Sequence, residues 1–444
     1  MSSHSTRTIA VGFVLIFNMF YNSGLLRANA PEQSAGTGDC SAASGGAVLL
    51  CVLNNHPELQ ASRKTLDRFA AEKRRAEQRV NPEFNSRVLG GDSAFTAEAA
   101  LRHTFETGGK RDARIDLAEQ NLRVARSRVY LRSNHLVLTA AIQLLQLRQA
   151  SEDVIFFEET QSTYARAIRR MRARPALSAE QRVNVTTYEI AANETRSRRA
   201  LLESEVLRLR SELQIAMGSH GPELAAADGL ALDFDWPEPD SLSADARESF
   251  ESLSEEERLA RTRVARAQSR VDLEGAEAFP NLSIGPALEY RQSRVPSGGI
   301  FGGTSRSSDA EIGLSFRFTL PLFHQNDGGR EAAEAELAAE RVRSVGVSSR
   351  SELERENRLR EYRLALRSLR TGISERDLRA RIDRLRKTIR GGRVSPPAVI
   401  EFYRSVFEYR HRRHDQELLA LHALLTMYAL DGRLLDKVQN DEIF

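Results

Sequence analysis

The sequence predicts a mainly α-helical protein with a small β part, built from two copies of one helix–strand–strand–helix unit. Three observations support this prediction. Charged residues make up 28% of the 444 residues, and Ala, Leu, Glu and Arg are frequent, which is typical of long helices. Four short segments instead alternate apolar and polar residues with the period of a strand. Corresponding residues of the two halves recur at an interval of about 200 residues, too long for a solenoid and typical of a duplicated domain-sized unit.

Charge and cysteine content exclude several classes of protein. The net charge is only +3 from 64 basic and 61 acidic side chains, which argues against a nucleic-acid-binding protein. Two cysteines, Cys40 and Cys51, are too few for a disulfide scaffold or a multi-cysteine metal site. In an oxidising compartment they can form one disulfide, and two free thiols are the alternative.

Residues 1–30 are predicted to be a signal peptide. Arg7 supplies a positive start, Ile9–Phe20 is apolar, and Ala28-Asn29-Ala30 fits a cleavage site. The apolar run is too short to span a bilayer, and no later stretch reaches about 18 apolar residues. The sequence therefore predicts an exported chain without a transmembrane helix.

The first repeat is predicted over residues 45–217. Its first helix opens at Pro57, because proline suits the first turn of a helix. Strands follow at about 84–89 and 95–106. Two long helices then cover 110–174 and 178–217, separated by Pro175, which cannot continue a helix. Ser178 and Gln181 have the spacing of a capping box at the start of the second helix.

A linker over 218–244, which holds three prolines and Trp236, leads into the second repeat over 245–432. Ser254 and Glu257 form another predicted capping box. Strands are expected at about 281–290 and 310–319, and helices at 330–389 and 396–430, followed by a tail over 433–444. The Ser- and Gly-rich stretch from Arg291 to Ser308 is predicted to be a loop inserted in this half only.

The predicted strands each carry one apolar face. Ile312, Leu314, Phe316 and Phe318 alternate with polar residues or glycine, as expected of a half-buried strand. Strands of about ten residues can span an outer membrane when tilted. An ordinary soluble hairpin packed on helices explains the same alternation, and on alternation alone it is the favoured interpretation.

Four motifs add a resemblance to a known family. They are His56-Pro57-Glu58-Leu59, Phe105–Arg111 (FETGGKR), Phe318–Gly328 (FTLPLFHQNDG) and Gly391–Ser395 (GGRVS). In this order and spacing they resemble the TolC-like outer-membrane efflux proteins, over residues 45–432. His324 stands where that family often has Asn. The chain is most similar to the cobalt–zinc–cadmium, heavy-metal efflux subgroup.

The resemblance implies a homotrimer in the cell outer membrane, with most of its mass in the periplasm. Three chains would form a twelve-stranded transmembrane β-barrel on a long periplasmic α-barrel. This would be the passive export conduit of a tripartite efflux system, carrying heavy-metal cations. Its partners would be a periplasmic adaptor protein, an inner-membrane pump of the resistance-nodulation-division type, and outer-membrane lipid.

The same resemblance assigns roles to residues. The lumen of the barrel would be faced by Glu98, Arg102, Glu311 and Arg317, and lipid by Leu314, Phe316 and Phe318. Extracellular loops would be Gly90–Ala94 and Arg291–Ser308, and the strand–helix junctions would include Gly108, Gly109, Pro321 and Gly328. The tip that contacts the adaptor would hold Arg174, Leu177, Ser178, Arg393, Val394 and Ser395. A plain N-cap is the alternative role for Ser178 and Ser395.

No set of residues suggests catalysis. His411 and His414 lie three apart on a predicted helix, which can suit a metal, but neighbouring arginines favour a solvated or lumen-facing stripe. No nucleophile–base set supports a periplasmic hydrolase, so neither an enzyme nor a cofactor is expected. The main alternative is an exported periplasmic coiled-coil scaffold or binding protein without a barrel. That alternative leaves four strands at matching points of two repeats unexplained.

Overall fold

A computed structural model describes residues 44–91, 94–218, 236–242, 253–297, 303–323, 325–390, 394–440 and 442–443. All of them belong to one compact unit that spans Asp39–Phe444. The predicted signal peptide over residues 1–30 lies outside the described residues. Cys40 also lies outside the described residues, and with it the predicted choice between a Cys40–Cys51 disulfide and two free thiols; Cys51 is disulfide-bonded.

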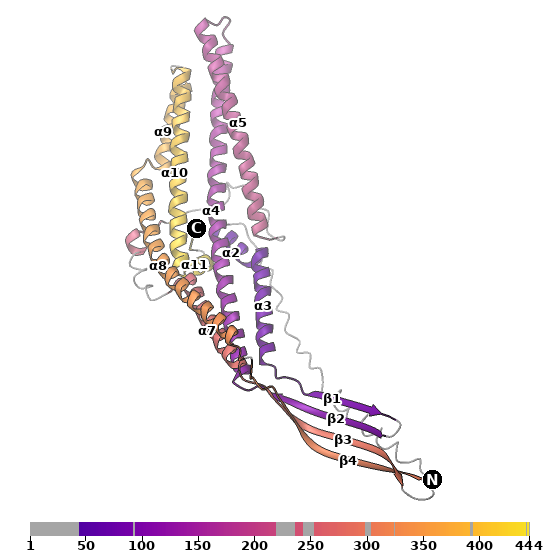
Figure 1. The fold of residues 1–444 in the computed structure, drawn as a ribbon. Helices are drawn as coiled ribbons and strands as arrows, with labels where there is room; N and C mark the ends of the chain where they lie inside the picture. The colour runs from indigo at the N-terminus through magenta and orange to yellow at the C-terminus, as the bar shows by residue number, and fades with distance from the viewer. Residues whose placement is uncertain are drawn as a thin grey trace. The chain divides into compact units, whose positions relative to one another are not determined.

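Each half of the chain places a pair of strands between helices (Figure 1). The first half comprises α2 (Gly45–Asn55), α3 (Pro57–Glu77), β1 (Glu83–Gly90), β2 (Ala94–Phe105), α4 (Lys110–Arg172) and α5 (Ala179–Ala216). The second half comprises α7 (Glu255–Glu277), β3 (Leu282–Ser297), β4 (Gly303–Phe318), α8 (Asp327–Thr371), α9 (Glu375–Arg390), α10 (Pro396–Leu430) and α11 (Leu434–Gln439). In each half a strand pair separates a shorter helix from long ones.

The four strands form one antiparallel sheet in the order β1-β2-β3-β4. Glu83 at the start of β1 pairs with Arg102 near the end of β2. Phe105 at the end of β2 pairs with Leu282 at the start of β3, which in turn pairs with Phe318 at the end of β4. All four connections between strands and helices therefore lie at the same end of the sheet.

Helix starts follow the predicted signals. Ser178 accepts a hydrogen bond from the backbone N–H of Gln181 at 3.2 Å, and the Gln181 side chain accepts one from Ser178 N–H. Ser254 and Glu257 make the same reciprocal pair at α7. Each capping box satisfies backbone donors that a helix start leaves unpaired, so both predictions are confirmed.

The predicted single helix over 330–389 is wrong, because two helices occupy that range. Helix α8 ends at Thr371 with Gly372 as its C-cap, and the Ser374 hydroxyl accepts a hydrogen bond from the backbone N–H of Asp377 at 3.1 Å at the start of α9. The hydroxyl of Tyr409 on α10 donates to the carbonyl of Ile373 at 3.0 Å. The backbone of Gly372 is extended, with φ of −73° and ψ of 170°, and the serine that follows caps a new helix.

The predicted loop from Arg291 to Ser308 is also wrong over most of its length. Strand β3 continues to Ser297, β4 begins at Gly303, and the two pair from Arg291–Asp309 up to Ser297–Gly303. Backbone hydrogen bonds sustain such a hairpin whatever the side chains are. The alternation of apolar residues ends at Tyr290. The sequence pattern therefore does not indicate that the strands continue beyond this point.

Two further segments differ from the prediction. The described part of the predicted linker, residues 236–242, packs on α8 and α10: Leu242 is buried there, and the Tyr362 hydroxyl donates to the carbonyl of Pro237 at 2.7 Å. The predicted tail contains helix α11, and α2 precedes the first predicted helix.

Two apolar clusters hold the long helices together. The first joins α2 and α11 to α4, α5 and α10, so segments near the two ends of the described chain share one core. The second lies further from the strands and joins α4, α5, α9 and α10 through aromatic side chains, among them Phe156, Tyr164, Tyr188 and Tyr403. Burial of these side chains, at about 25 cal/mol per Å² of apolar surface, supplies most of the stability of the bundle.

Candidate functional site: the two-faced sheet, its junction and the helix tips

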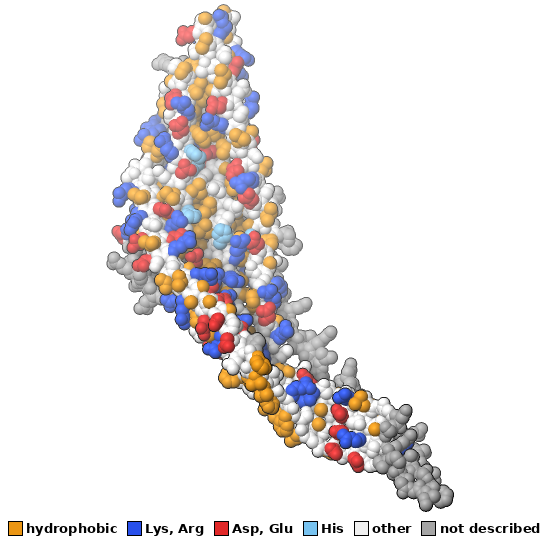
Figure 2. Space-filling view, viewed as in Figure 1, with side chains coloured by type: hydrophobic (Ala, Val, Ile, Leu, Met, Phe, Trp, Pro, Cys, Tyr) orange, Lys and Arg blue, Asp and Glu red, His pale blue; other side chains and the backbone are white. Residues whose placement is uncertain are grey.

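One face of the sheet is apolar across all four strands. Directly paired residues of neighbouring strands lie on the same face. On β4, Ile312, Leu314 and Phe316 pair with Leu288, Pro286 and Ile284 of β3, and β2 and β1 continue this face with Ala99, Leu101, Phe105 and Phe84. Ile312 is 85% exposed and Leu314 67%. An apolar surface of this extent marks an interaction site, and Figure 2 shows hydrophobic side chains gathered where the sheet meets the helices.

The opposite face is polar and carries a transverse row of charges. Arg87 of β1 pairs with Glu98 of β2, Glu98 with Glu289 of β3, and Glu289 with Glu311 of β4. We call these four residues the charged row. Glu289 also contacts Arg291 at 2.6 Å. The predicted lumen residues Glu98 and Glu311 thus share one face and one level, and the sequence pattern alone missed Arg87 and Glu289.

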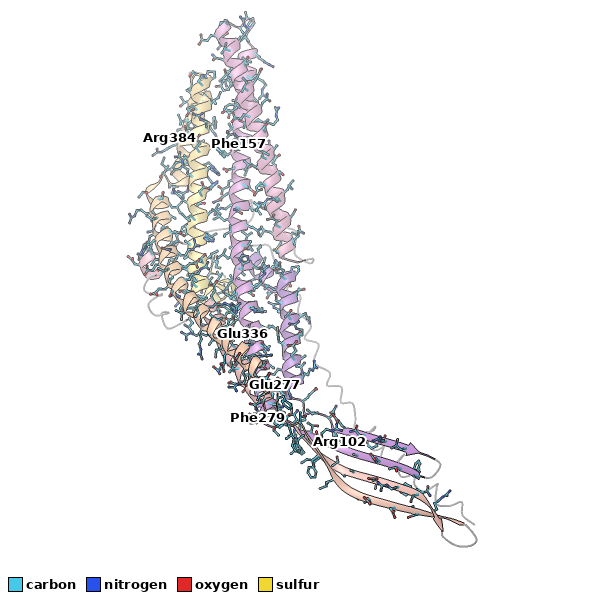
Figure 3. The ribbon with its side chains drawn as sticks, in the orientation of Figure 1. Arg102, Phe157, Glu277, Phe279, Glu336 and Arg384 are labelled. Atoms are coloured by element: carbon cyan, nitrogen blue, oxygen red, sulfur yellow. The ribbon has the colours of Figure 1, made fainter. Side chains whose placement is uncertain are left out.

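Charges near the helix end of the same face bring the two edge strands together. Arg317 of β4 lies 4.0 Å from Glu83 of β1, although two strands separate them in the sheet. Arg102, which Figure 3 marks on the sheet, pairs with Glu83 in the β1–β2 ladder. The predicted residues Arg102 and Arg317 therefore lie on the polar face, and Leu314, Phe316 and Phe318 lie on the apolar face.

The strand–helix junction is built around two glycines with left-handed backbone. Gly108 has φ of +69° and Gly109 has φ of +73°, a region that side-chain-bearing residues rarely adopt. A Cβ on Gly108 would lie 2.6 Å from the ring of Phe279, whereas Gly109 faces open space. Phe279 follows α7 in the other half of the chain (Figure 3). The two halves thus touch at Gly108.

Polar contacts also join the two halves at the junction. The Lys110 ammonium donates to Asn281 Oδ1 at 2.8 Å, and Thr107 donates to the carbonyl of Pro280. In the second half the left-handed residue is Asn326, with φ of +58°. Its amide donates to the Glu274 carboxylate at 2.7 Å. Of the predicted junction residues, Gly328 has no such backbone strain, and Pro321 lies three residues after the end of β4 in the connection to α8.

An ion pair stabilises the junction between β2 and α4. Arg114 of α4 contacts both carboxylate oxygens of Glu106, the second at 3.1 Å. The same guanidinium donates to the carbonyls of Ala76 and Gln78 at the end of α3, where a cation is favoured. The hydrogen bond to Glu106 raises the pKa of Arg114. This contact ties β2, α3 and α4 together.

The predicted tip residues lie at the helix ends away from the strands (Figure 1). Arg174 and Ser178 are exposed and Leu177 is half-buried in the turn between α4 and α5. Ser178 is an N-cap; Ser395 occupies the N-cap position of α10 but accepts no capping hydrogen bond. Val394 is half-buried, and Arg393 lies outside the described residues. Contacts among α4, α5, α9 and α10 bring both turns to one end.

Charged groups between α4 and α10 do not assemble a metal site. Arg410 contacts Asp153 at 3.3 Å and Glu152 at 3.2 Å. His414 lies 3.6 Å from Asp153, whereas His411 stacks on Phe407 instead. Among the described residues, no group of three or more His, Cys, Asp or Glu side chains is arranged to hold a metal ion.

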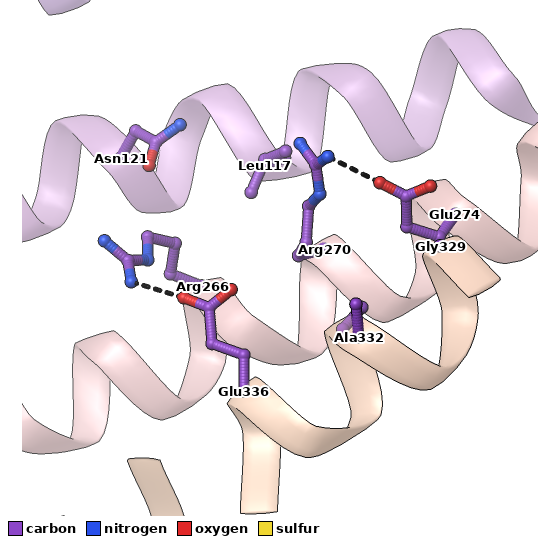
Figure 4. Close-up of a pocket in the computed structure, with 9 residues that line it drawn as sticks. Leu117, Asn121, Arg266, Arg270, Glu274, Gly329, Ala332 and Glu336 are labelled. Atoms are coloured by element: carbon purple, nitrogen blue, oxygen red, sulfur yellow. Dashed lines mark hydrogen bonds and ion pairs between the residues drawn. The ribbon is translucent and has the colours of Figure 1, made fainter. Parts of the chain in front are cut away.

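A polar cavity near the junction offers ion pairs rather than a reactive set. It has a volume of about 420 Å³ and lies between α4, α7 and α8 (Figure 4). Arg266 contacts Glu336 at 2.9 Å and Arg270 contacts Glu274 at 2.5 Å. Leu117, Asn121, Gly329 and two alanines complete the lining. Each charge has an opposite charge beside it, and the lining holds no Ser, Cys or His for nucleophilic chemistry.

Among the helices that the structure describes, none combines the length and apolarity that crossing a bilayer would require.

Comparison with known proteins identifies the fold. No protein-family profile and no curated protein matches the sequence. Several solved structures do match. The channel-forming protein CusC shares 16% identity over 87% of this chain and 92% of its own, with a TM-score of 0.61. The Neisseria gonorrhoeae outer-membrane channel MtrE shares 14% over 88% and 90%, with a TM-score of 0.65. The Campylobacter jejuni outer-membrane channel CmeC shares 12% over 90% and 89%, with a TM-score of 0.64. The chain therefore has the fold of these outer-membrane channels.

Proposed function

We propose that this protein is the outer-membrane channel component of a tripartite efflux system. In this proposal three copies assemble, and each gives four strands to a twelve-stranded barrel. The apolar face of the sheet contacts lipid, and the polar face lines the water-filled lumen. Most of the mass lies in the periplasm, where the long helices form a tube. The protein is a passive conduit and needs no cofactor.

The observation that carries this proposal is the two-faced sheet. Its apolar face has no cover among the described residues, and its edge strands β1 and β4 have unpaired backbone groups on one side. In the proposed barrel, lipid covers the apolar face. Pairing of β4 with β1 of the next copy satisfies the backbone groups of the edge strands. A closed barrel is the form of sheet that a bilayer accepts, because lipid cannot hydrogen-bond an open edge.

The dimensions of the apolar face support the same conclusion. From Leu282 to Tyr290 on β3 the apolar residues cover eight residue steps, roughly 27 Å along a strand. A tilt of about 40° reduces this to roughly 20 Å, close to the apolar band of about 25 Å in outer-membrane barrels. Helix α4 has 63 residues and therefore spans roughly 95 Å, enough for a long periplasmic tube.

Exposed apolar side chains on the helices support a homotrimer. On α8, Val342, Leu353 and Leu364 are exposed and recur every eleven residues, and on α5 Ile190 and Leu201 share the same spacing. An eleven-residue repeat keeps side chains in line along a nearly straight helix. Two such stripes can pack against each other when copies lie side by side, which removes this apolar surface from water.

We infer partners and cargo from the resemblance in sequence together with the sheet. The tip residues Arg174, Leu177, Ser178, Val394 and Ser395 contact a periplasmic adaptor, which links the channel to an inner-membrane pump of the resistance-nodulation-division type. The cargo is a heavy-metal cation. The charged row supports a cation, since it holds three carboxylates and one guanidinium per chain and stays net acidic with Arg291 beside Glu289.

Membrane fractionation of the full-length chain tests the proposal, followed by imaging of the particle extracted in detergent. We expect the protein in the outer membrane and a trimeric tube of roughly 100 Å or more. A soluble periplasmic monomer would overturn the proposal in favour of a helical scaffold. For the cargo, deletion of the gene should raise sensitivity to divalent metals, and unchanged sensitivity would reject heavy-metal export alone.

A further inference from the structure

Both helix tips are strongly basic although the whole chain is nearly neutral. Residues 165–182, at the α4–α5 turn, hold six arginines and one glutamate, and helix α9 holds seven basic and three acidic residues. The net charges are +5 and +4, against +3 for the whole chain. The positive charge of this protein is therefore concentrated at the tips.

Much of this charge is uncompensated. Six basic side chains of the two segments are exposed and have no ionic partner among the described residues: Arg169, Arg174, Arg376, Arg381, Arg384 and Lys387. Some arginines elsewhere on the helices are instead paired within their own helix, as Arg208 is with Glu212 at 2.5 Å and Arg360 with Glu356 at 2.9 Å. Like charges held close together repel one another, and an anionic partner would relieve that repulsion.

The two basic segments form one surface. Leu378 and Ile382 on the buried side of α9 share an apolar cluster with Tyr164 of α4 and Tyr188 of α5. Arg386 of α9 forms an ion pair with Glu159 of α4. Figure 1 shows both helix turns at the end away from the strands, and Figure 3 marks Arg384 on α9. A single partner can thus contact both segments.

The pattern of apolar residues selects the class of partner. Val183 and Ile190 of α5 are each 65% exposed and seven residues apart, so they lie on one face of the helix. Leu385 of α9 is exposed among the arginines. A partner helix with an apolar seam and acidic flanks matches this arrangement. A membrane surface does not, because the α4–α5 turn offers only Ala, Pro and the half-buried Leu177 as apolar residues.

We propose that the two helix tips form a cationic docking surface for an acidic α-helical hairpin. The proposal rests on the proposed function, in which this tip meets an adaptor, and adds the charge that the adaptor must carry. Arg169, Arg381 and Arg384 join the predicted contact residue Arg174 as its main determinants. Electrostatic complementarity of this kind sets partner choice and the rate of association.

The test measures binding of the detergent-solubilised full-length protein to two soluble helical hairpins. The hairpins are identical except that four Glu or four Lys residues flank the turn. We expect the Glu hairpin to bind and the Lys hairpin not to bind. Replacing Arg169, Arg174, Arg381 and Arg384 by Gln should weaken binding of the Glu hairpin at least about tenfold and flatten its salt dependence.

A matched variant controls for the change in total charge. Arg74, Arg75, Arg79 and Arg350 are exposed and unpaired among the described residues but lie away from the tips. Their replacement by Gln should change binding less than about twofold. Equal binding of the two hairpins, or equal loss in both variants, overturns the inference. So does binding to polyglutamate, or to phosphatidylglycerol vesicles, as tight as to the Glu hairpin.

Failure of this inference is distinguishable from failure of the proposed function. The same preparation is imaged for trimeric tubes and tested for conductance in planar bilayers. A conducting trimer without preference for the Glu hairpin rejects only the charge assignment. A preparation that forms no trimer and no channel rejects the proposed function, and it therefore also rejects the inferred docking surface.

Discussion

Gly108 is the residue on which the junction between sheet and helices depends most directly. Its φ of +69° is costly for any residue with a side chain, and its Cα faces the ring of Phe279 from the other half of the chain. The left-handed conformation alone costs roughly 1–2 kcal/mol for an L-residue. The position therefore needs glycine for two independent reasons, conformation and space.

We expect Gly108→Ala to destabilise the protein more than Gly109→Ala. Both substitutions strain the backbone, but only the first places a methyl group 2.6 Å from Phe279. Overpacking adds about 1–3 kcal/mol. Thermal unfolding of the detergent-solubilised protein, followed by circular dichroism, measures the difference. Adding Phe279→Ala should recover part of the loss in the Gly108→Ala variant only. Equal melting temperatures for the two glycine variants would contradict the steric argument.

His422 gives the protein a predictable response to acid. This half-buried side chain on α10 has a lowered pKa, first because burial disfavours its charged form and then because Arg358 repels it. Between the folded pKa and the unfolded value near 6.5 the unfolded chain binds a proton that the folded chain does not. The free energy of unfolding therefore decreases as pH falls through this window.

The variant His422→Gln should lose less stability than the wild type between pH 7.5 and pH 5. Melting temperatures measured across this range check the expectation, because the wild-type curve should fall more steeply below about pH 6.5. The exposed His135 provides the control, and His135→Gln should follow the wild type. Parallel curves for wild type and His422→Gln would show that burial of His422 carries no cost.

Residues that act locally could be predicted from the sequence, and those that act across the chain could not. The capping serines Ser178 and Ser254 need only a partner three residues away, and both predictions are confirmed. Gly108 could be recognised as a junction residue, but its contact with Phe279 joins positions 171 residues apart. Arg87 and Glu289 were missed because their significance depends on the register of the sheet.

At the scale of elements, strand β4 allows the two faces of the sheet to be compared directly. Leu314 pairs with Pro286 on the apolar face, and its neighbour Gly313 pairs with Ala287 on the polar face. An added side chain at Gly313 would meet no atom within 4 Å. The two positions therefore differ in the surface they face rather than in depth along the strand.

We expect Leu314→Arg to impair folding into membranes and Gly313→Arg to be tolerated. An arginine facing lipid near the middle of a bilayer costs about 2–4 kcal/mol, whereas one facing the lumen stays hydrated. Urea unfolding of protein reconstituted in lipid vesicles measures both variants against the wild type. Equal destabilisation by the two substitutions would mean that the apolar face does not contact lipid.

Element boundaries show where a periodic pattern misleads. The pattern of α8 and α9 reads as one helix because apolar positions keep the helical period on both sides of Gly372. The break depends on local capping by Ser374 and on Tyr409 from α10, which holds the carbonyl of Ile373. The far ends of β3 and β4 could not be predicted, because a regular structure is present there without a periodic pattern. These segments pair through backbone groups, and their side chains show no apolar alternation.

At the scale of the whole molecule, the charged row would form a ring of charges in the proposed assembly, in which three copies close the sheet into a barrel. In one chain, the four residues of the charged row sum to a charge of −2, which Arg291 beside Glu289 reduces to −1 at this level of the polar face. Closure of a barrel would repeat this charge around a water-filled lumen. Rings of carboxylates in such a position favour cations over anions.

Replacing Glu98, Glu289 and Glu311 together by Gln should therefore reduce the preference of the channel for cations. The measurement is the reversal potential of the reconstituted protein in a planar bilayer under a KCl gradient. We expect the wild type to be cation-selective and the triple variant to shift toward anions, because only Arg87 of the row stays charged. Asp67→Asn, Glu72→Gln and Glu77→Gln on α3 remove the same number of charges away from the sheet and should leave the potential unchanged. If the α3 variant shifted the potential as much as the sheet variant, total charge rather than the row would set selectivity.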